Sequence, residues 1–325
     1  MNYFRFLFGI CLLLFLQPVS AKSIFKLYNA VRKDYYKQDT SKYEVYLKEI
    51  LKKEPNNAKD YQAKCSILKM LNKYDLCIVY TQKAIELYPS IYANYLLQSD
   101  NYWQVKDKKR AFEMLEQAMR IDSVSIPDTY NKRGNLYLQT GEFEKAVKDF
   151  DACVRLGSNM WTKSAVREAI YLKGFAYAYL ADYPNAIATF KYFEKDSFGY
   201  SRFAKLELGK LYSISGKTAE AMPLLKQYIS KYPKDSTSVA LCYAYLDNKE
   251  AALRMLPSSK IRYIELTKAE VYSILYETEK ALEQIEKLLE CGYDRFSVLA
   301  NDIDLINIKN LPKFKELLQK YKQPE

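Results

Sequence analysis

Small side chains recur along this chain at nearly regular intervals, and they form two parallel series. The first series steps by 34, 35, 40, 35, 30 and 30 residues and consists of Cys77, Ala111, Ala146, Ala186, Ala221, Ala251 and Ala281. The second series consists of Cys65, Ser99, Gly134, Gly174, Gly209, Ala240 and Ala269. Three residues after these stand Leu68, Tyr102, Tyr137, Tyr177, Tyr212, Tyr243 and Tyr272. A period of this length is the signature of a chain built from stacked supersecondary units.

One unit shows what the period contains. The stretch Thr129–Ser158 reads TYNKRGNLYLQTGEFEKAVKDFDACVRLGS and holds two helical apolar patterns joined at Gly141. Gly134 lies inside the first pattern and Ala146 inside the second. A glycine inside a helix costs about 1 kcal/mol relative to alanine, so it needs a packing reason. We expect Gly134 and Ala146 to face each other where the paired helices cross, so that the two backbones approach closely.

These residues resemble the tetratricopeptide repeat, a helix–turn–helix of 34 residues, over roughly Ser23–Tyr293. The resemblance implies an all-α, right-handed α-solenoid of about eight repeats, with aromatic residues such as Tyr137 between neighbouring repeats. Pro257 is expected to end the second helix of the seventh repeat early. We place the repeats at 24–57, 58–91, 92–126, 127–161, 167–201, 202–235, 236–258 and 259–293.

The C-terminal residues carry a second resemblance. The stretch Cys291–Tyr321 resembles the capping sequence that follows many bacterial tetratricopeptide arrays. A solenoid needs such a cap because its last repeat exposes an apolar face. The resemblance implies that residues 294–325 cap the array, with these residues covering the last repeat: Leu305, Phe314, Leu317 and Leu318. Asp302 and Asp304 could indicate calcium, but two acids at a capping turn more often start a helix. We predict no metal here.

The first 21 residues have the layout of a secretory signal peptide. A basic Arg5 precedes an apolar run from Phe6 to Leu16, and the small-residue ending Val19-Ser20-Ala21 follows. The apolar run is short for a membrane span. We therefore expect residues 1–21 to be removed, and the repeat array to occupy residues 22–293 of an exported, periplasmic or secreted protein. An uncleaved membrane anchor is the alternative.

Catalytic chemistry is hard to place in this sequence. The chain of 325 residues has no histidine, which is the commonest general base and a frequent metal ligand. It also has no glycine-rich phosphate loop. Acids such as Asp149 and Asp151 lie on second helices, where we expect a solvated surface. We predict that the protein is not an enzyme and uses no cofactor.

The charge balance is basic, with 50 Lys and Arg against 39 Asp and Glu. Lysines are dispersed among acids, as in EFEKAVKDF, so we do not expect nucleic acid as a partner. The family resemblance implies a scaffold that binds a segment of a partner protein in its concave groove, and the signal-like N-terminus leads us to expect this scaffold in the cell envelope. The alternative is an envelope or outer-membrane assembly factor that acts through its basic surface, with peripheral membrane contact. The oligomeric state stays open.

The cysteines leave two alternatives open. Five remain after residue 21, and an odd number argues against a fully paired framework. Cys65 and Cys77 occupy the two facing small positions of one repeat, where a disulfide could form if the Cα atoms lie within about 7 Å. The other interpretation is that both are small buried apolar residues.

A one-sided stripe of the first helix of each repeat is expected to point into the groove. It combines aromatic, cationic and amide side chains, which are typical of recognition surfaces. Packing against neighbouring repeats is the alternative for each aromatic residue. Asn131 and Asn135 resemble part of a carboxylate clamp, but the expected lysine is absent, so that ligand is not carried over. The full stripe consists of Tyr28, Arg32, Tyr35, Lys69, Trp103, Asn131, Asn135, Leu138, Tyr171, Phe175, Tyr179, Phe203 and Lys210.

Removal of the signal peptide can be checked directly. Mass spectrometry of the natively produced protein is expected to show Lys22 at the N-terminus, because the small residues before it form a cleavage site. An intact Met1 or a lipid on Cys11 would contradict this prediction.

Overall fold

The computed structural model describes residues 23–36, 43–121, 126–157, 163–193, 200–256 and 264–322. The predicted signal peptide lies outside these residues. The described residues form 18 helices, α2 to α19, and contain no strand, which confirms the all-α solenoid of repeats. None of these helices is long and apolar enough to cross a membrane.

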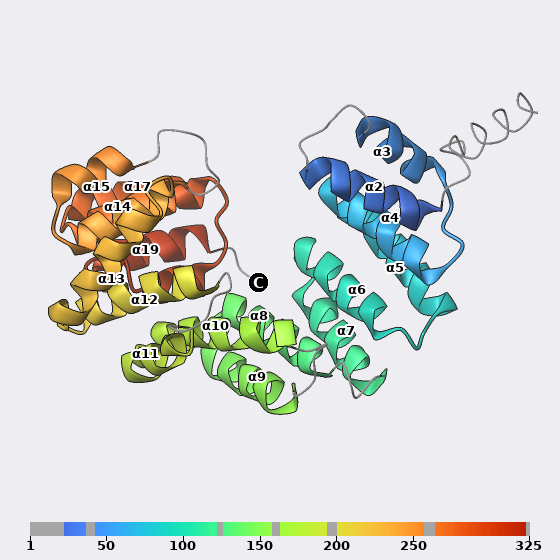
Figure 1. The fold of residues 1–325 in the computed structure, drawn as a ribbon, viewed down its shortest axis with the longest axis horizontal. Helices are drawn as coiled ribbons and strands as arrows, with labels where there is room; N and C mark the ends of the chain where they lie inside the picture. The colour runs from blue at the N-terminus through green and yellow to red at the C-terminus, as the bar shows by residue number, and fades with distance from the viewer. Residues whose placement is uncertain are drawn as a thin grey trace, which may run out of the picture. The chain divides into compact units, whose positions relative to one another are not determined.

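The helices follow one another as eight antiparallel pairs and two closing helices (Figure 1). The pairs are α2 (Ile24–Tyr36) with α3 (Tyr43–Lys52), α4 (Ala58–Met70) with α5 (Tyr74–Leu87), α6 (Tyr92–Gln104) with α7 (Lys108–Ile121), α8 (Ile126–Thr140) with α9 (Phe143–Leu156), α10 (Lys163–Tyr179) with α11 (Tyr183–Lys191), α12 (Tyr200–Ile214) with α13 (Thr218–Lys231), α14 (Ser236–Tyr245) with α15 (Lys249–Met255), and α16 (Ile264–Ile274) with α17 (Thr278–Glu290). The closing helices are α18 (Phe296–Asn301) and α19 (Pro312–Tyr321). Helix α15 ends two residues before Pro257, as expected.

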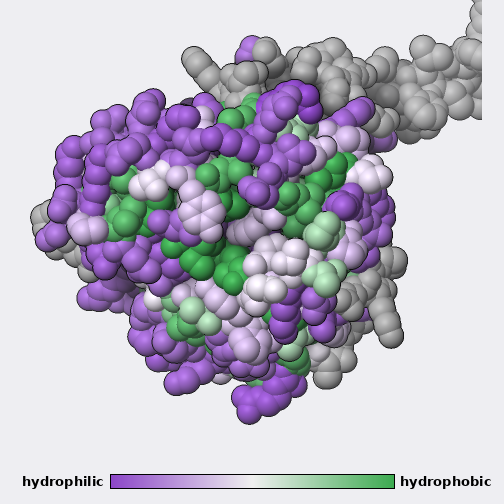
Figure 2. All heavy atoms as spheres, turned by 90° about the vertical axis from the view of Figure 1, so that its left-hand side faces the viewer, coloured by the Kyte–Doolittle hydropathy of each residue, from purple (hydrophilic) through white to green (hydrophobic). Residues whose placement is uncertain are grey.

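The chain divides into two compact units. The N-terminal unit is Met1–Thr129 and the C-terminal unit is Tyr130–Glu325. The closing helices α18 and α19 therefore belong to the C-terminal unit. In the side view of Figure 2, hydrophilic residues cover most of the periphery and hydrophobic residues gather in the middle of the face. This distribution is typical of amphipathic helices that turn their apolar stripes toward their neighbours.

The turn inside each repeat has one conformation. A residue with positive φ, between 56° and 86°, ends the first helix of seven repeats. The backbone N–H that follows donates to the carbonyl of the residue five positions earlier, as Glu142 does to Tyr137 at 2.9 Å. This bond is the Schellman ending of a helix, and it fixes the direction of the next helix. The residues with positive φ are Asn72, Lys106, Gly141, Ala181, Gly216, Asp247 and Tyr276.

The glycines of the first helices accept large side chains from the second helices. A methyl group placed at Gly134 would lie 2.8 Å from Cε1 of Phe150, and one placed at Gly174 would lie 2.6 Å from Cζ of Phe190. The expected partner, Ala146, is fully buried one turn before Phe150. The reason for Gly134 is therefore corrected: the glycine leaves room for the ring of Phe150, rather than for a second small residue.

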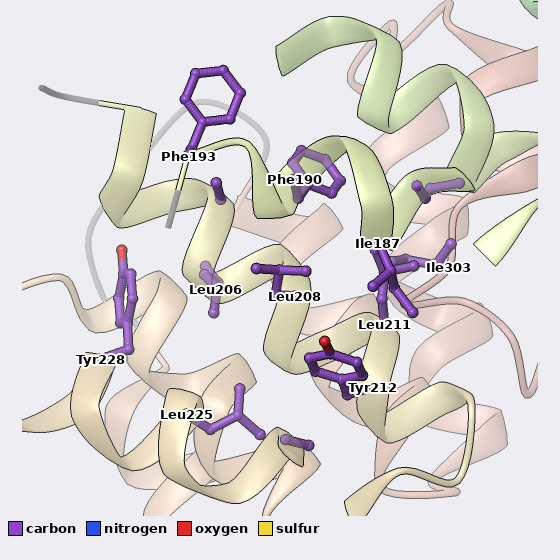
Figure 3. Packing of buried hydrophobic residues seen from close by; sticks show 14 of the residues in the cluster. Ile187, Phe190, Phe193, Leu206, Leu208, Leu211, Tyr212, Leu225, Tyr228 and Ile303 are labelled. Carbon is purple, nitrogen blue, oxygen red and sulfur yellow. The ribbon is translucent and has the colours of Figure 1, made fainter. Parts of the chain in front are cut away.

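The largest hydrophobic cluster joins helices α10 to α14, and it includes Ile303 from the residues between α18 and α19. Figure 3 shows Leu208 and Leu211 on α12 and Leu225 on α13 within this cluster. A separate cluster covers the last repeat with the predicted capping residues. Leu305, Phe314 and Leu317 are buried in it, and Leu318 packs against it.

The fit of glycine to ring predicts a specific coupling. Gly134→Ala is expected to destabilise the fold by about 1–3 kcal/mol, because the added methyl overpacks the site, although alanine is the better helix former. Adding Phe150→Leu should restore part of this loss. Urea unfolding of both single variants and the double variant gives the interaction energy between the two positions. If Gly134→Ala is as stable as the parent chain, the packing role of the glycine is refuted.

Candidate partner-binding groove

The N-terminal unit keeps several of the predicted groove residues partly accessible. The guanidinium of Arg32 lies 5.8 Å from the ring centroid of Tyr28 on the same helix. Lys69 Nζ lies 3.2 Å from Asp100 Oδ2, which links α4 to α6. Trp103 on α6 is half-buried. These first helices therefore present aromatic and cationic groups, while the side chain of Tyr35 falls outside the described residues.

The aromatic candidates of the C-terminal unit pack against other rings. Tyr171 lies 4.9 Å from Tyr200, measured between ring centroids. Phe175 meets Phe190 edge-on at 5.3 Å. Edge-to-face and tilted contacts at these distances stabilise the interior of a protein. For Tyr171 and Phe175 the geometry therefore favours the packing alternative.

Tyr179, the third aromatic candidate of α10, packs in the same way. Its ring lies 5.2 Å from Phe143 of α9 and 6.3 Å from Phe175 of its own helix. Burial, with the negative charge of Asp302 adding to it, raises the pKa of the Tyr179 hydroxyl well above its usual range. Tyr179 therefore faces the interior of the C-terminal unit and the residues that follow α18.

The candidates on α8 are also engaged within the C-terminal unit. Asn131 is 8% exposed, and its Nδ2 donates to Glu168 Oε2 of α10 at 2.9 Å. Asn135 accepts a hydrogen bond from Gln139 at 3.1 Å. Leu138 is buried among the residues of α9 and α10. Of this group, Asn135 alone keeps partial exposure.

Lys210, predicted to contact a partner, binds an acid of its own chain. It is 6% exposed, and its Nζ lies 2.7 Å from Asp304 Oδ2 and 3.1 Å from Glu207 Oε2. The hydroxyl of Tyr245 donates to Asp304 Oδ1 at 2.6 Å. Asp304 is therefore bound by side chains from two first helices, α12 and α14. The expectation that Lys210 faces an open groove is corrected, because Asp304 of the same chain covers this side chain.

Neighbouring residues extend this contact. We call residues 297–307 the closing segment. The side chain of Asn307 donates to the carbonyl of Ser273 on α16 at 2.9 Å, and Ile303 is 4% exposed within the main cluster. At the other end, Ser297 lies against Gly141, so closely that a methyl group on this glycine would clash with it. The closing segment thus contacts the first helices of three successive repeats and the α8–α9 turn.

The closing segment also buries acidic groups. Carboxylate oxygens of Glu270, Asp302 and Asp304 all lie within 4.8 Å of one another, a spacing that a cation could bridge. The ammonium of Lys210 already provides positive charge at Asp304. The sequence predicts that Asp302 starts a helix, but this prediction is wrong. Asp302 instead ends α18 and accepts a hydrogen bond from the backbone N–H of Asp304 at 2.8 Å. We keep the prediction that no metal binds here.

Burial shifts the protonation of this cluster. Burial, followed by the charge of Asp304, raises the pKa of Asp302 to about 7. Burial also raises the pKa of Glu270 well above its usual range, with Asp302 and Asp304 adding to the effect. For Lys210, burial lowers the pKa, but the surrounding carboxylates outweigh it and raise the pKa well above its usual range. Lys210 therefore supplies one positive charge to the cluster, and burial favours the protonated forms of Asp302 and Glu270.

The paired cysteine positions hold free thiols. Cys65 and Cys77 are both fully buried, and Cys77 Sγ donates to the carbonyl of Cys65 at 3.1 Å. Cys65 Sγ lies 3.2 Å from Thr81 Oγ1. The two helices thus approach closely at this position, as the small residues predicted.

The acid cluster predicts a pH dependence. Since the folded pKa of Asp302 exceeds the ordinary value of about 4, the folded state holds a proton that the unfolded state loses. Its contribution to stability is complete below about pH 4 and is lost as the pH rises to about 7. Asp302→Asn is expected to reduce this fall by up to about 4 kcal/mol, at about 1.4 kcal/mol for each pKa unit, measured by urea unfolding at several pH values.

Two further variants control this measurement. Asp304→Asn should lower the free energy of unfolding at neutral pH, in contrast to Asp302→Asn. It removes one of the carboxylates that pair with the buried ammonium of Lys210. Glu316→Gln, an exposed change on α19, should leave the pH profile as it is. An Asp302→Asn profile that matches the parent profile would contradict the assignment.

Comparison with known proteins agrees with this geometry. A family model described as tetratricopeptide repeat matches residues 92–124 and 127–158. Anaphase-promoting complex subunit 7 of Arabidopsis thaliana is 26% identical over 194 residues, which are 49% of this chain and 35% of that protein. The chain therefore spans about a third of that relative's length.

Two solved structures share the fold. A tetratricopeptide repeat protein from Parabacteroides merdae superposes with a TM-score of 0.56 at 18% identity, covering 81% of this chain and 98% of that one. PilW, described as a widely conserved type IV pilus biogenesis factor, superposes with a TM-score of 0.51 at 17% identity. The match covers 70% of this chain and 97% of PilW. Likenesses at this identity show the fold alone. Together with the matched repeats, they support a tetratricopeptide repeat protein.

Proposed function

We propose that this protein is a non-enzymatic scaffold that holds a segment of a partner protein on the first helices of its N-terminal unit. Tetratricopeptide repeat proteins are protein–protein interaction scaffolds, and the matched repeats support this general role. The observation that carries the proposal is the contrast between the units. Lys210 of the C-terminal unit is bound by the closing segment, whereas Trp103 and Arg32 of the N-terminal unit remain partly accessible.

The side chains of the N-terminal unit favour a segment with apolar anchors and acidic groups. Trp103 is half-buried and Met70, on the neighbouring first helix, is 42% exposed. The cation Arg32 lies on a preceding first helix, whereas Lys69 is already paired with Asp100. Trp and Arg are among the residue types that most often carry binding energy at interfaces. A partner segment that alternates apolar and acidic side chains would satisfy both.

We place this scaffold in the cell envelope because of the signal-like residues 1–21. The alternative is an assembly factor that acts through the basic surface of the chain, whose formal net charge is +11. Binding to anionic surfaces is screened by salt, whereas apolar anchoring is not. Release from membrane fractions by high salt, with loss of partner binding under the same conditions, would favour the alternative.

Substitution of Trp103 tests the proposed groove. A photo-crosslinking residue at Met70 identifies the partner in native cells, and the affinity for the crosslinked segment is then measured with purified protein. Trp103→Ala is expected to weaken binding by about 1–3 kcal/mol, because it removes a large apolar anchor. The matched control is Leu87→Ala, which removes a 60% exposed apolar side chain from the second helix α5.

The result has a clear contrary outcome. If Trp103→Ala folds normally and binds as tightly as Leu87→Ala, the groove of the N-terminal unit is not the partner site. Phe175→Ala is unsuitable for this test. Its ring packs against Phe190, so truncation is expected to cost about 3–5 kcal/mol of stability instead.

A further inference from the structure

A small, open hollow of about 30 Å³ lies between the start of α12 and the end of α13. Helix α12 contributes Ser201, Arg202 and Lys205 to its wall, and helix α13 contributes Gln227, Tyr228 and Lys231. The closing segment and its acidic cluster are not part of this wall. The hollow is therefore a separate feature of the C-terminal unit.

The wall of the hollow is strongly cationic. Arg202, Lys205 and Lys231 contribute three positive charges, and Asp235 forms an ion pair with Arg202 at 3.3 Å. Lys205 and Lys231 have no acidic partner among the residues that the structure describes. Like charges around a recess attract anions, because a bound anion relieves their repulsion.

The guanidinium of Arg202 is held in a fixed orientation. Its central carbon lies 4.3 Å from the ring centroid of Phe203 and 5.0 Å from that of Tyr232. Asp235 binds one terminal nitrogen and also accepts the hydroxyl of Tyr228 at 2.9 Å. The Nε of Arg202 is buried and has no hydrogen-bond acceptor among the described residues. An arginine fixed by stacking loses little freedom when it binds an oxyanion.

The neutral groups of the wall suit the same chemistry. Ser201 and Gln227 can each donate a hydrogen bond to an oxygen atom. Three cations and one acid leave a surplus of two positive charges, which matches a phosphate dianion better than a single carboxylate. We propose that the α12–α13 hollow binds a phosphate group. This group is either free inorganic phosphate or a phosphomonoester carried on a larger molecule.

Calorimetric titration of the full chain tests this proposal. The ligands are sodium phosphate and phenyl phosphate, each at an ionic strength matched with sodium chloride. Wild-type protein is expected to bind with a saturable, one-to-one isotherm. Lys205→Gln combined with Lys231→Gln should weaken binding at least tenfold, and each single change should weaken it less. The matched control is Lys226→Gln, which removes an exposed lysine of α13 outside the hollow and should leave affinity unchanged.

The two sources of phosphate give different results. Phenyl phosphate that binds tenfold tighter than inorganic phosphate assigns the site to a phosphomonoester, and equal or weaker binding assigns it to free phosphate. The proposal is overturned if wild-type protein shows no saturable binding beyond the chloride control. It is also overturned if the folded double variant, checked by circular dichroism, binds as tightly as Lys226→Gln.

Discussion

The fit between a small residue on one helix and a large one on its partner determines the rest of this structure. Gly134 accepts the ring of Phe150, Gly174 accepts that of Phe190, and both pairs have the same spacing along the chain. Because the contact recurs in the same register, successive helix pairs take similar geometries, and the positive-φ turn between the helices can repeat as well. Dense packing makes such fits sensitive to single methyl groups, so the repeats depend on size complementarity more than on helix propensity.

Stacked repeats leave apolar surface at their ends, and this chain covers it with its own residues. The closing segment does more than cap the last pair, because it lies across the first helices of earlier repeats and buries Asp304 against Lys210 and Tyr245. Burying an ion pair costs desolvation energy, and removing one of its two partners destabilises the protein more, because an unpaired charge then stays buried. The ion pair between Asp304 and Lys210 therefore favours one position of the closing segment on the C-terminal unit.

Local spacing predicts the fold well because each repeat contacts mainly its neighbours. The small-residue series predicts the helix pairs, and the apolar residues Leu305 and Phe314 are buried in the cluster of the last repeat. Long-range polar pairs were not predictable in this way. Lys210 and Asp304 lie in different parts of the sequence, and no period relates them. The sequence pattern predicts a solvated surface for Asp149, but Asp149 is 5% exposed and accepts two hydrogen bonds from Arg133, which reaches it from the first helix.

Helix α12 shows how one helix serves two environments. Its inner face carries Lys210, whose charge is matched by the acids of the closing segment. Its N-terminal end carries Arg202 and Lys205. Among the described residues, Asp235 is the acid that pairs with the cations around the hollow. Charge that is already compensated inside a protein is unavailable for recognition, whereas uncompensated charge at a recess attracts ligands. On α12, Lys205 therefore keeps its positive charge available for binding at the hollow, whereas the charge of Lys210 is compensated by the closing segment.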